Sequence, residues 1–299
     1  MAIQTGESLA KVLRGLLEAP GIHQGPVCYD ALSAKLVEKA GFPFCFTGGF
    51  HTAASRLGLP DCDLTSYAEF VDHGRQITEA VSIPVIGDAD DGFGNAMNLK
   101  RTVRGYIRAG YAGIMLDDQV SVKPCGRGHE KLVASREESV MRIKAAVDAR
   151  KESGIDIVIL GRTDRLAVSL EEAIWRSRAF AEAGADVIFL DNLYSREEMK
   201  AFCDAIPQVP KLVAHMGEGG DKPFPTLSEF ADIGYKLVAY PFCLLGVSIQ
   251  AMLTALSAVK SGGLPPPGTV ASMDKMKEVL GFHNYFEEEK RYALSPSQQ

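Results

Sequence analysis

Short apolar runs alternate with longer amphipathic segments along most of the chain. The apolar runs have the length of buried strands, whereas the segments between them repeat apolar residues at helical spacing. Eight runs are strand candidates, at residues 27–29, 44–47, 85–88, 113–116, 157–161, 187–191, 211–214 and 237–240. Helical patterns cover residues 8–17, 32–40, 99–109, 136–152, 170–183 and 196–206, and three of them are followed by the helix-ending glycines Gly41, Gly110 and Gly184.

Repeated strand–helix units predict a parallel sheet of the α/β class, and eight of them favour closure into a (β/α)8 TIM barrel. An open, doubly wound sheet is the competing architecture. It would favour a Gly-x-Gly-x-x-Gly fingerprint after an early strand, and the sequence has none at such a place. No Pro/Ser-rich linker or charge block divides the 299 residues, so we expect one barrel domain over residues 1–299. Residues 265–299 begin with three prolines and are expected to form a C-terminal helical extension, with one or two helices in 274–292.

Composition narrows the classes of protein that fit this pattern. The net charge of -6 gives no support to nucleic-acid binding. No apolar run approaches the roughly 20 residues needed to span a bilayer, and the first ten residues lack the pattern of a secretory signal, so we expect no membrane partner. The six cysteines lack CxxC spacing, which argues against a zinc site or a disulfide framework and favours a reduced, cytoplasmic compartment.

The third apolar run ends in an unusually acidic stretch. Asp88 closes the run and is followed within three residues by Asp90 and Asp91, while Gly92 and Gly94 permit a tight turn. Carboxylate oxygens are the hard ligands that Mg²⁺ or Mn²⁺ prefers. Because barrel enzymes carry their catalytic groups at the C-terminal ends of strands, this stretch is a candidate metal site. An acidic loop that holds no ion is the alternative interpretation.

Polar side chains also follow the other predicted strands. Carboxylates from several strand ends would repel one another unless a cation lay among them, which favours a divalent metal. Arg162 matches the geometry of a substrate carboxylate, although an ion pair with a neighbouring aspartate would serve a purely structural role. The backbone N–H groups near Gly48 and Gly49 could bind an anionic oxygen, or the glycines could simply form a turn. The residues at these strand ends are Tyr29, Thr47, Gly48, Gly49, Asp117, Asp118, Arg162, Asp191, Asn192 and His215.

A loop at residues 120–134 follows the fourth strand and has the composition of a mobile lid. Cys125 and Gly126 lie in it among Lys, Arg and His residues, which should lower the pKa of the thiol and allow proton exchange near neutral pH. An incidental exposed thiol is the alternative.

These residues resemble the isocitrate lyase and phosphoenolpyruvate mutase superfamily. The likeness runs from residues 29–34 through 87–90 and 118–119 to 281–285. Within the superfamily, residues 135–150 and 236–241 are similar to the group of the plant petal death protein and of proteins called carboxyvinyl-carboxyphosphonate phosphorylmutase.

The resemblance implies a barrel whose last helix is exchanged between subunits, usually in a homotetramer. It also implies a Mg²⁺-dependent or Mn²⁺-dependent reaction on a small 2-hydroxy or 2-oxo dicarboxylate through an enolate. Asp88 would hold the metal, helped by Asp61, Asp90 and Asp117. The implied catalytic residues are Cys125 on the lid, Arg162 as carboxylate clamp, Asp191 and His215. The implied substrate-binding residues are Tyr29, Thr47, Gly48, Gly49, Asp61, Gly126, Arg162 and His215.

The sequence departs from the family pattern at several positions. Arg127 follows Cys125-Gly126 where the family has His, Asp117 and Asp191 replace Glu, and Thr47 replaces Ser. Asp91 adds a charge where relatives carry Thr, which suggests an unfamiliar substrate. His215 replaces an Asn, and it could be a new acid/base group or a filler that narrows the pocket.

The leading functional hypothesis is a Mg²⁺-dependent carbon–carbon lyase for an alkylmalate or methylisocitrate type of substrate, with oxaloacetate hydrolysis as a close variant. The alternatives are phosphoenolpyruvate mutase or phosphonopyruvate hydrolase chemistry, and an altered barrel that binds a dicarboxylate without turnover. Cys125 favours the first hypothesis because the mutase and phosphonopyruvate hydrolase relatives do not depend on a Cys-Gly lid.

Overall fold

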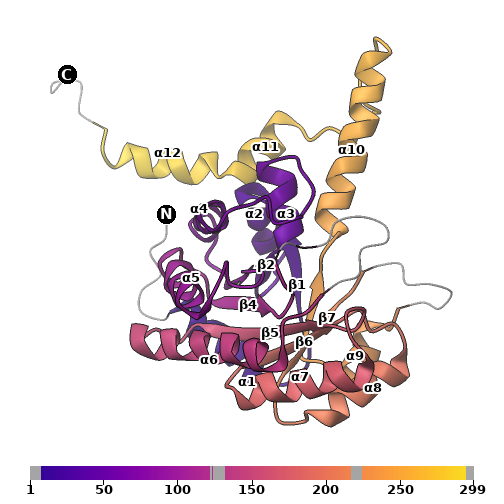
Figure 1. Ribbon diagram of the computed structural model, residues 1–299. Coiled ribbons are helices and arrows are strands. Elements are labelled where there is room, and N and C mark those ends of the chain that lie inside the picture. The colour runs from indigo at the N-terminus through magenta and orange to yellow at the C-terminus, as the bar shows by residue number, and fades with distance from the viewer. Residues whose placement is uncertain (1–7, 122, 124–131, 217–223, 294–299) are drawn as a thin grey trace. The chain divides into compact units, whose positions relative to one another are not determined.

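The computed structural model describes residues 8–121, 123, 132–216 and 224–293. Eight parallel strands form a closed barrel in sequential order, and helices surround it (Figure 1). This confirms the predicted (β/α)8 barrel. The strands are β1 (His23–Cys28), β2 (Cys45–Thr47), β3 (Val85–Asp88), β4 (Gly113–Asp117), β5 (Val158–Asp164), β6 (Val187–Asp191), β7 (Lys211–Ala214) and β8 (Leu237–Tyr240).

All eight predicted strands exist. Their observed bounds differ most from the predicted ones at the start of β1 and at the end of β5. β1 begins four residues earlier than expected, because residues 23–26 pair with β8. β5 continues three residues past its predicted end, because its pairing with β6 extends to Asp164 opposite Asp191. Arg162 therefore lies on a strand rather than in the loop after it.

The helices of the barrel are α1 (Leu9–Glu18), α2 (Ala31–Lys39), α3 (Gly49–Arg56), α4 (Tyr67–Thr78), α5 (Ala96–Arg108), α6 (Arg136–Ser153), α7 (Leu170–Glu182), α8 (Arg196–Ala205) and α9 (Leu227–Ile233). The sequence patterns did not predict α3, α4 and α9. Two of them carried a usable signal, since α4 and α9 each begin with a capping box, Ser66 with Glu69 and Thr226 with Glu229. α3 begins at the Gly48-Gly49 pair, which is typical of a turn.

The core has two layers. Inside the barrel, Phe44, Phe46, Met115 and Phe189 belong to one apolar cluster, and Leu13 of α1 joins it. A second cluster fills the space between the strands and the surrounding helices. Burial of this apolar surface is the main force that holds the barrel together and fixes its strand ends.

Residues 246–299 form a second compact unit, distinct from residues 1–245. α11 (Met273–Leu280) and α12 (Phe282–Lys290) are the helices expected in 274–292, and the predicted extension from residue 265 lies within this unit. α10 (Cys243–Lys260), which the sequence patterns missed, has a mean hydropathy of 1.5 over 18 residues and only 6% of it is buried. It is long and apolar enough to cross a membrane, so the statement that no run approaches that length was wrong, although one such helix is weak evidence for membrane insertion.

The cysteines differ in one respect from the expectation. Cys28, Cys45, Cys203 and Cys243 are free thiols. Cys62 is disulfide-bonded, a single bond that the argument against a disulfide framework did not foresee.

Candidate functional site

A cavity of about 350 Å³ lies at the C-terminal end of the barrel. It is bordered by the last residues of several strands, which is where barrel enzymes place their chemistry. Seven predicted site residues line it, namely Thr47, Gly48, Gly49, Asp61, Asp88, Arg162 and Asp191. A larger hollow of about 670 Å³ lies in the second unit, and the described residues that line it belong to α12 or are Tyr292 and Ala293 just after it, so no strand ends meet there.

Asp88 is held by backbone groups on both sides of its carboxylate. The N–H of Gly49, in the first turn of α3, donates to Asp88 Oδ2 at 3.1 Å, and the N–H of Asp90 donates to Asp88 Oδ1 at 3.1 Å. Asp90 has a left-handed backbone with a φ of 46°, a conformation that aspartate tolerates better than most residues. The Gly49 N–H group therefore binds a carboxylate of the protein itself, and the turn brings Asp90 back beside Asp88.

Four carboxylates crowd one side of the site. A Cβ atom at Gly49 would lie 3.2 Å from Asp90 Oδ1 and 3.3 Å from Asp61 Oδ1, so a larger residue there would crowd both side chains. Burial raises the pKa of Asp90 to about 8, and the charge of Asp88 adds to this effect. Burial also raises the pKa of Asp117, at the end of β4, against the opposing charge of Arg162. Cation binding would relieve this strain because it favours the ionised carboxylates.

Lys123 supplies a positive charge to the cluster, a role that the sequence patterns did not predict. Its Nζ atom lies 3.0 Å from Asp61 Oδ1 and also contacts Asp90 Oδ1. Its backbone N–H donates to Asp63 Oδ2 at 2.5 Å, and its side chain is 15% exposed. The pKa of Lys123 is raised, because the charges of Asp90, Asp88 and Asp61 outweigh burial, which by itself would lower it.

The donor set fits a divalent cation in its chemistry. Asp61, Asp88, Asp90 and Asp117 offer only hard carboxylate oxygens, as Mg²⁺ requires. Within the described part of the chain, no three His, Cys, Asp or Glu residues are gathered closely enough to hold an ion. In this structure the Lys123 ammonium group bridges Asp61 and Asp90 instead.

Arg162 lies at the cavity between two carboxylates. Its Nη2 atom donates to Asp191 Oδ2 at 2.7 Å, and its Nε atom is 3.4 Å from Asp117 Oδ2. Nε is buried and makes no hydrogen bond. Burial alone would lower the pKa of Arg162, but the charges of Asp117 and Asp191 outweigh burial. The net pKa is raised, so the guanidinium stays charged. The ion pair considered as an alternative role therefore exists, with Asp191, and the cavity-lining guanidinium can still meet a ligand.

Other predicted site residues lie outside the cavity lining. His215 packs against the rings of Phe224 and Tyr240, with centroids 5.1 and 5.3 Å away, rather than lining the cavity. Tyr29 is not among the lining residues either. Cys125 and Gly126, with Arg127, lie outside the described residues.

Asp91 is not among the described residues that line the cavity. Its carboxylate accepts a hydrogen bond from the Phe93 N–H at 2.8 Å and another from the Ser121 hydroxyl. The suggestion that its extra charge alters the substrate stays a prediction. Asp91 ties the acidic turn to the chain after β4.

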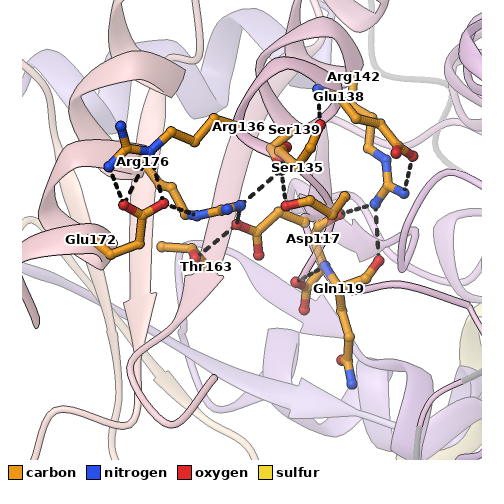
Figure 2. A network of polar contacts seen from close by, with 12 residues as sticks. Asp117, Gln119, Ser135, Arg136, Glu138, Ser139, Arg142, Thr163, Glu172 and Arg176 are labelled. Carbon is orange, nitrogen blue, oxygen red and sulfur yellow. Dashed lines mark hydrogen bonds and ion pairs between the residues drawn. The ribbon is translucent and has the colours of Figure 1, made fainter. Parts of the chain in front are cut away.

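A buried polar network surrounds residues 117–119 at the end of β4, and the sequence patterns did not predict it (Figure 2). Asp118 Oδ2 accepts hydrogen bonds from Thr163 on β5 and Arg176 on α7, each at 2.9 Å. Arg176 also donates to Ser139 at 2.9 Å and to Glu172 at 2.8 Å. Burial and the charge of Asp117 raise the pKa of Asp118 to about 7.

The Arg142 side chain holds the same turn by binding the turn's backbone carbonyl groups (Figure 2). Its Nη1 atom donates to the carbonyl oxygens of Asp117 at 3.2 Å and Gln119 at 2.9 Å, while Nη2 pairs with Glu138 at 2.7 Å. Two buried arginines from α6 and α7 thus fix residues 117–119, and with them the position of Asp117 beside Arg162.

Sequence comparison finds relatives of this chain among known enzymes. The family model described as phosphoenolpyruvate phosphomutase matches residues 13–260. 2,3-Dimethylmalate lyase of Eubacterium barkeri is 38% identical over 287 residues, which cover 95% of this chain and 98% of that protein. The petal death protein of Dianthus caryophyllus is 33% identical, over 97% of this chain and 91% of that protein.

Solved structures agree as well. Oxaloacetate acetylhydrolase bound to 3,3-difluorooxalacetate has a TM-score of 0.89 at 32% identity, covering 97% of this chain and 98% of that chain. Phosphonopyruvate hydrolase in complex with oxalate and Mg²⁺ has a TM-score of 0.82 at 27% identity, covering 96% and 99%. The barrel, the acidic strand ends and these matches confirm the resemblance, and the chain belongs to the phosphoenolpyruvate mutase/isocitrate lyase superfamily.

Proposed function

We propose that this protein is a Mg²⁺-dependent carbon–carbon lyase that cleaves a small 2-hydroxy dicarboxylate of the alkylmalate type. The observation that carries the proposal is one cavity lined by both the Asp61 and Asp88 carboxylates and the Arg162 guanidinium. A cation at the carboxylates and Arg162 together match a substrate that is anionic at its oxygenated end. The similarity to 2,3-dimethylmalate lyase over almost the whole chain supports the same reaction class.

Magnesium is the proposed metal, with Mn²⁺ as a substitute. Asp88 would hold it, with help from Asp61, Asp90 and Asp117, and its presence in the related phosphonopyruvate hydrolase structure supports this choice. When bound, the metal supplies fixed positive charge where negative charge develops on the substrate oxygens. For Asp61 and Asp90 to reach the metal, Lys123 would have to share or release these two carboxylates.

The residues of the chain then have distinct roles in the cleavage. Arg162 binds a substrate carboxylate, and Asp117 and Asp191 hold its guanidinium in place. The C2–C3 bond breaks, its electron pair stays on C3 as an enolate, and the C2 hydroxyl becomes a carbonyl by losing its proton to a carboxylate of the acidic cluster. Cys125, in its reduced thiol form, returns a proton to C3, which completes the release of a 2-oxo acid and a second carboxylic acid.

A substrate panel tests this function. We expect Mg²⁺-dependent production of a 2-oxo acid from alkylmalates, and no isomerisation of phosphoenolpyruvate. The similarity to oxaloacetate acetylhydrolase makes oxaloacetate hydrolysis the second candidate, to be measured in the same panel. Binding of oxalate without turnover of any member would contradict the lyase and favour a dicarboxylate-binding barrel. Cys125→Ser should reduce turnover by about 10²-fold, and an unchanged rate would exclude its role.

We also propose that the protein is a cytoplasmic homotetramer in which a second copy covers α10. Exposed apolar side chains along this helix, including Val247, Met252, Leu253, Leu256 and Val259, support an obligate protein contact. Exchange of this helix between subunits is the arrangement we expect. Replacing Leu253 and Leu256 with Asp should produce monomers in size-exclusion chromatography with light scattering, whereas an unchanged mass would contradict the proposal.

A further inference from the structure

Three aromatic rings stand together at one wall of the cavity. Phe50 and His51 lie in the first turn of α3, and Phe242 lies just after β8. The rings of Phe50 and Phe242 meet edge to face with centroids 5.6 Å apart, and His51 stacks on Phe242 at 6.1 Å. All three line the cavity that also contains Asp88 and Arg162.

His51 anchors this wall. Its Nε2 atom is hydrogen-bonded to the carbonyl oxygen of Pro241, the residue before Phe242. The side chain is buried, and burial lowers the pKa of His51, so the ring is neutral at physiological pH. A neutral imidazole bonded to a carbonyl oxygen carries its proton on Nε2. A Cβ atom at Gly48 would approach His51 Nδ1 to 2.9 Å, so glycine at this position makes room for the ring.

Phe50 and Phe242 remain open to solvent at the mouth of the cavity. They are 48% and 40% exposed, whereas Phe44 and Phe230 of the core are fully buried. Large apolar side chains that stay exposed beside a polar site are typical of ligand-binding surfaces. The cavity is thus lined both by polar groups, at Asp88 and Arg162, and by the aromatic rings of Phe50 and Phe242.

We infer that Phe50 and Phe242 bind an apolar alkyl substituent at C3 of the substrate, with His51 as the positioning residue that holds Phe242. This inference rests on the proposed lyase function and adds the substrate preference. Arg162 and the acidic cluster bind the charged end of the molecule, and the substituent on C3 then packs against the two rings. An aromatic surface favours an alkyl group and disfavours a substituent that ends in a carboxylate, because burying an unpaired charge is costly.

The preference can be measured with three 2-hydroxy acids that differ only at C3. Malate carries no substituent, 3-ethylmalate carries an alkyl group, and isocitrate carries a substituent that ends in a carboxylate. We expect kcat/KM for 3-ethylmalate to exceed that for each of the other two by about tenfold or more, since one methylene in an apolar pocket changes discrimination by roughly 10–200-fold.

The two rings are then removed one at a time. Phe50→Ala and Phe242→Ala should each reduce the preference for 3-ethylmalate over malate by about fivefold or more, while Phe242→Leu should retain part of it. Ile155→Ala is the matched control, because Ile155 is 45% exposed and lies before β5, at the opposite end of the barrel. The preference in this control should equal that of the unsubstituted protein.

Two outcomes would overturn the inference. One is an unchanged preference in both alanine variants, and the other is an isocitrate kcat/KM equal to that of 3-ethylmalate. Binding of the same acids to the Mg²⁺-loaded protein, measured by calorimetry, distinguishes failure of the aromatic subsite from failure of the lyase proposal. An alkyl preference in binding without any turnover would reject the lyase and keep the aromatic subsite.

Discussion

Replacing Arg176 with methionine should strongly destabilise the barrel. The Arg176 side chain is 6% exposed, and its partner Asp118 is 1% exposed at 2.9 Å. Methionine fills similar space but, among the described residues, leaves the buried Asp118 carboxylate with Thr163 as its remaining hydrogen-bond donor. Removing one partner of a buried ion pair typically costs about 3–5 kcal/mol, because an uncompensated charge stays inside the protein.

The cost should depend on pH in a defined direction. Asp118 has a pKa of about 7 with Arg176 present, already above its usual range. Without the guanidinium this pKa rises further, so the variant protein binds a proton on Asp118 that the unfolded chain releases near pH 4. The loss of stability should therefore be larger at pH 8 than at pH 6, because protonation removes the unpaired charge at the lower pH.

Urea denaturation followed by circular dichroism measures this loss. Adding Asp118→Leu to Arg176→Met should recover a large part of it, since replacing both partners of a buried pair by apolar side chains is often close to neutral. Arg196→Met is the matched control, because its ion pair with Glu229 is 42% exposed on both sides and should matter little. A single variant as stable as the control, or a double variant less stable than the single one, would refute the reasoning.

Three further predictions concern the site itself. Lys123→Met should increase the affinity for Mg²⁺ by about tenfold or more, measured by calorimetry, because an ammonium group within 4 Å of shared carboxylates repels a second cation; weaker binding would indicate that Lys123 instead positions the ligands. Arg162→Lys should raise KM for the dicarboxylate by about tenfold or more, because lysine cannot form two parallel hydrogen bonds; an unchanged KM would contradict the clamp. In the metal-free protein the contribution of Asp90 to stability should fall as pH rises from about 4 to about 8, because folded Asp90, with its pKa of about 8, keeps a proton that the unfolded chain releases. In urea titrations across this range, Asp90→Asn should flatten the dependence, and a stability that rises with pH would be the opposite result.

The strand ends were the part of the site that the sequence could predict. An apolar run that stops at a charged residue marks the point where a barrel strand reaches solvent, so Asp88 and Asp191 could be assigned before their contacts were known. The same rule placed His215 at the site, yet its ring packs among aromatic side chains. A strand end therefore fixes where a residue lies, whereas neighbours from other elements decide where its side chain points.

Contacts between distant residues could not be predicted from one sequence. Asp118 meets partners that are 45 and 58 residues away, and Lys123 reaches Asp61 from 62 residues away. Phe242 was equally hidden, because an exposed ring at the cavity and a buried ring in the core have the same appearance in a hydrophobicity pattern. The capping boxes of α4 and α9 are different, since their spacing was present in the sequence and would have predicted both helices.

The most direct test of the central claim is a Mg²⁺ titration of the metal-free protein with an alkylmalate as substrate. We expect no 2-oxo acid in the presence of EDTA, a rate that saturates with added Mg²⁺, and a much higher Mg²⁺ concentration for half-maximal rate in Asp88→Asn. Cleavage of the substrate at the same rate in EDTA would contradict the claim.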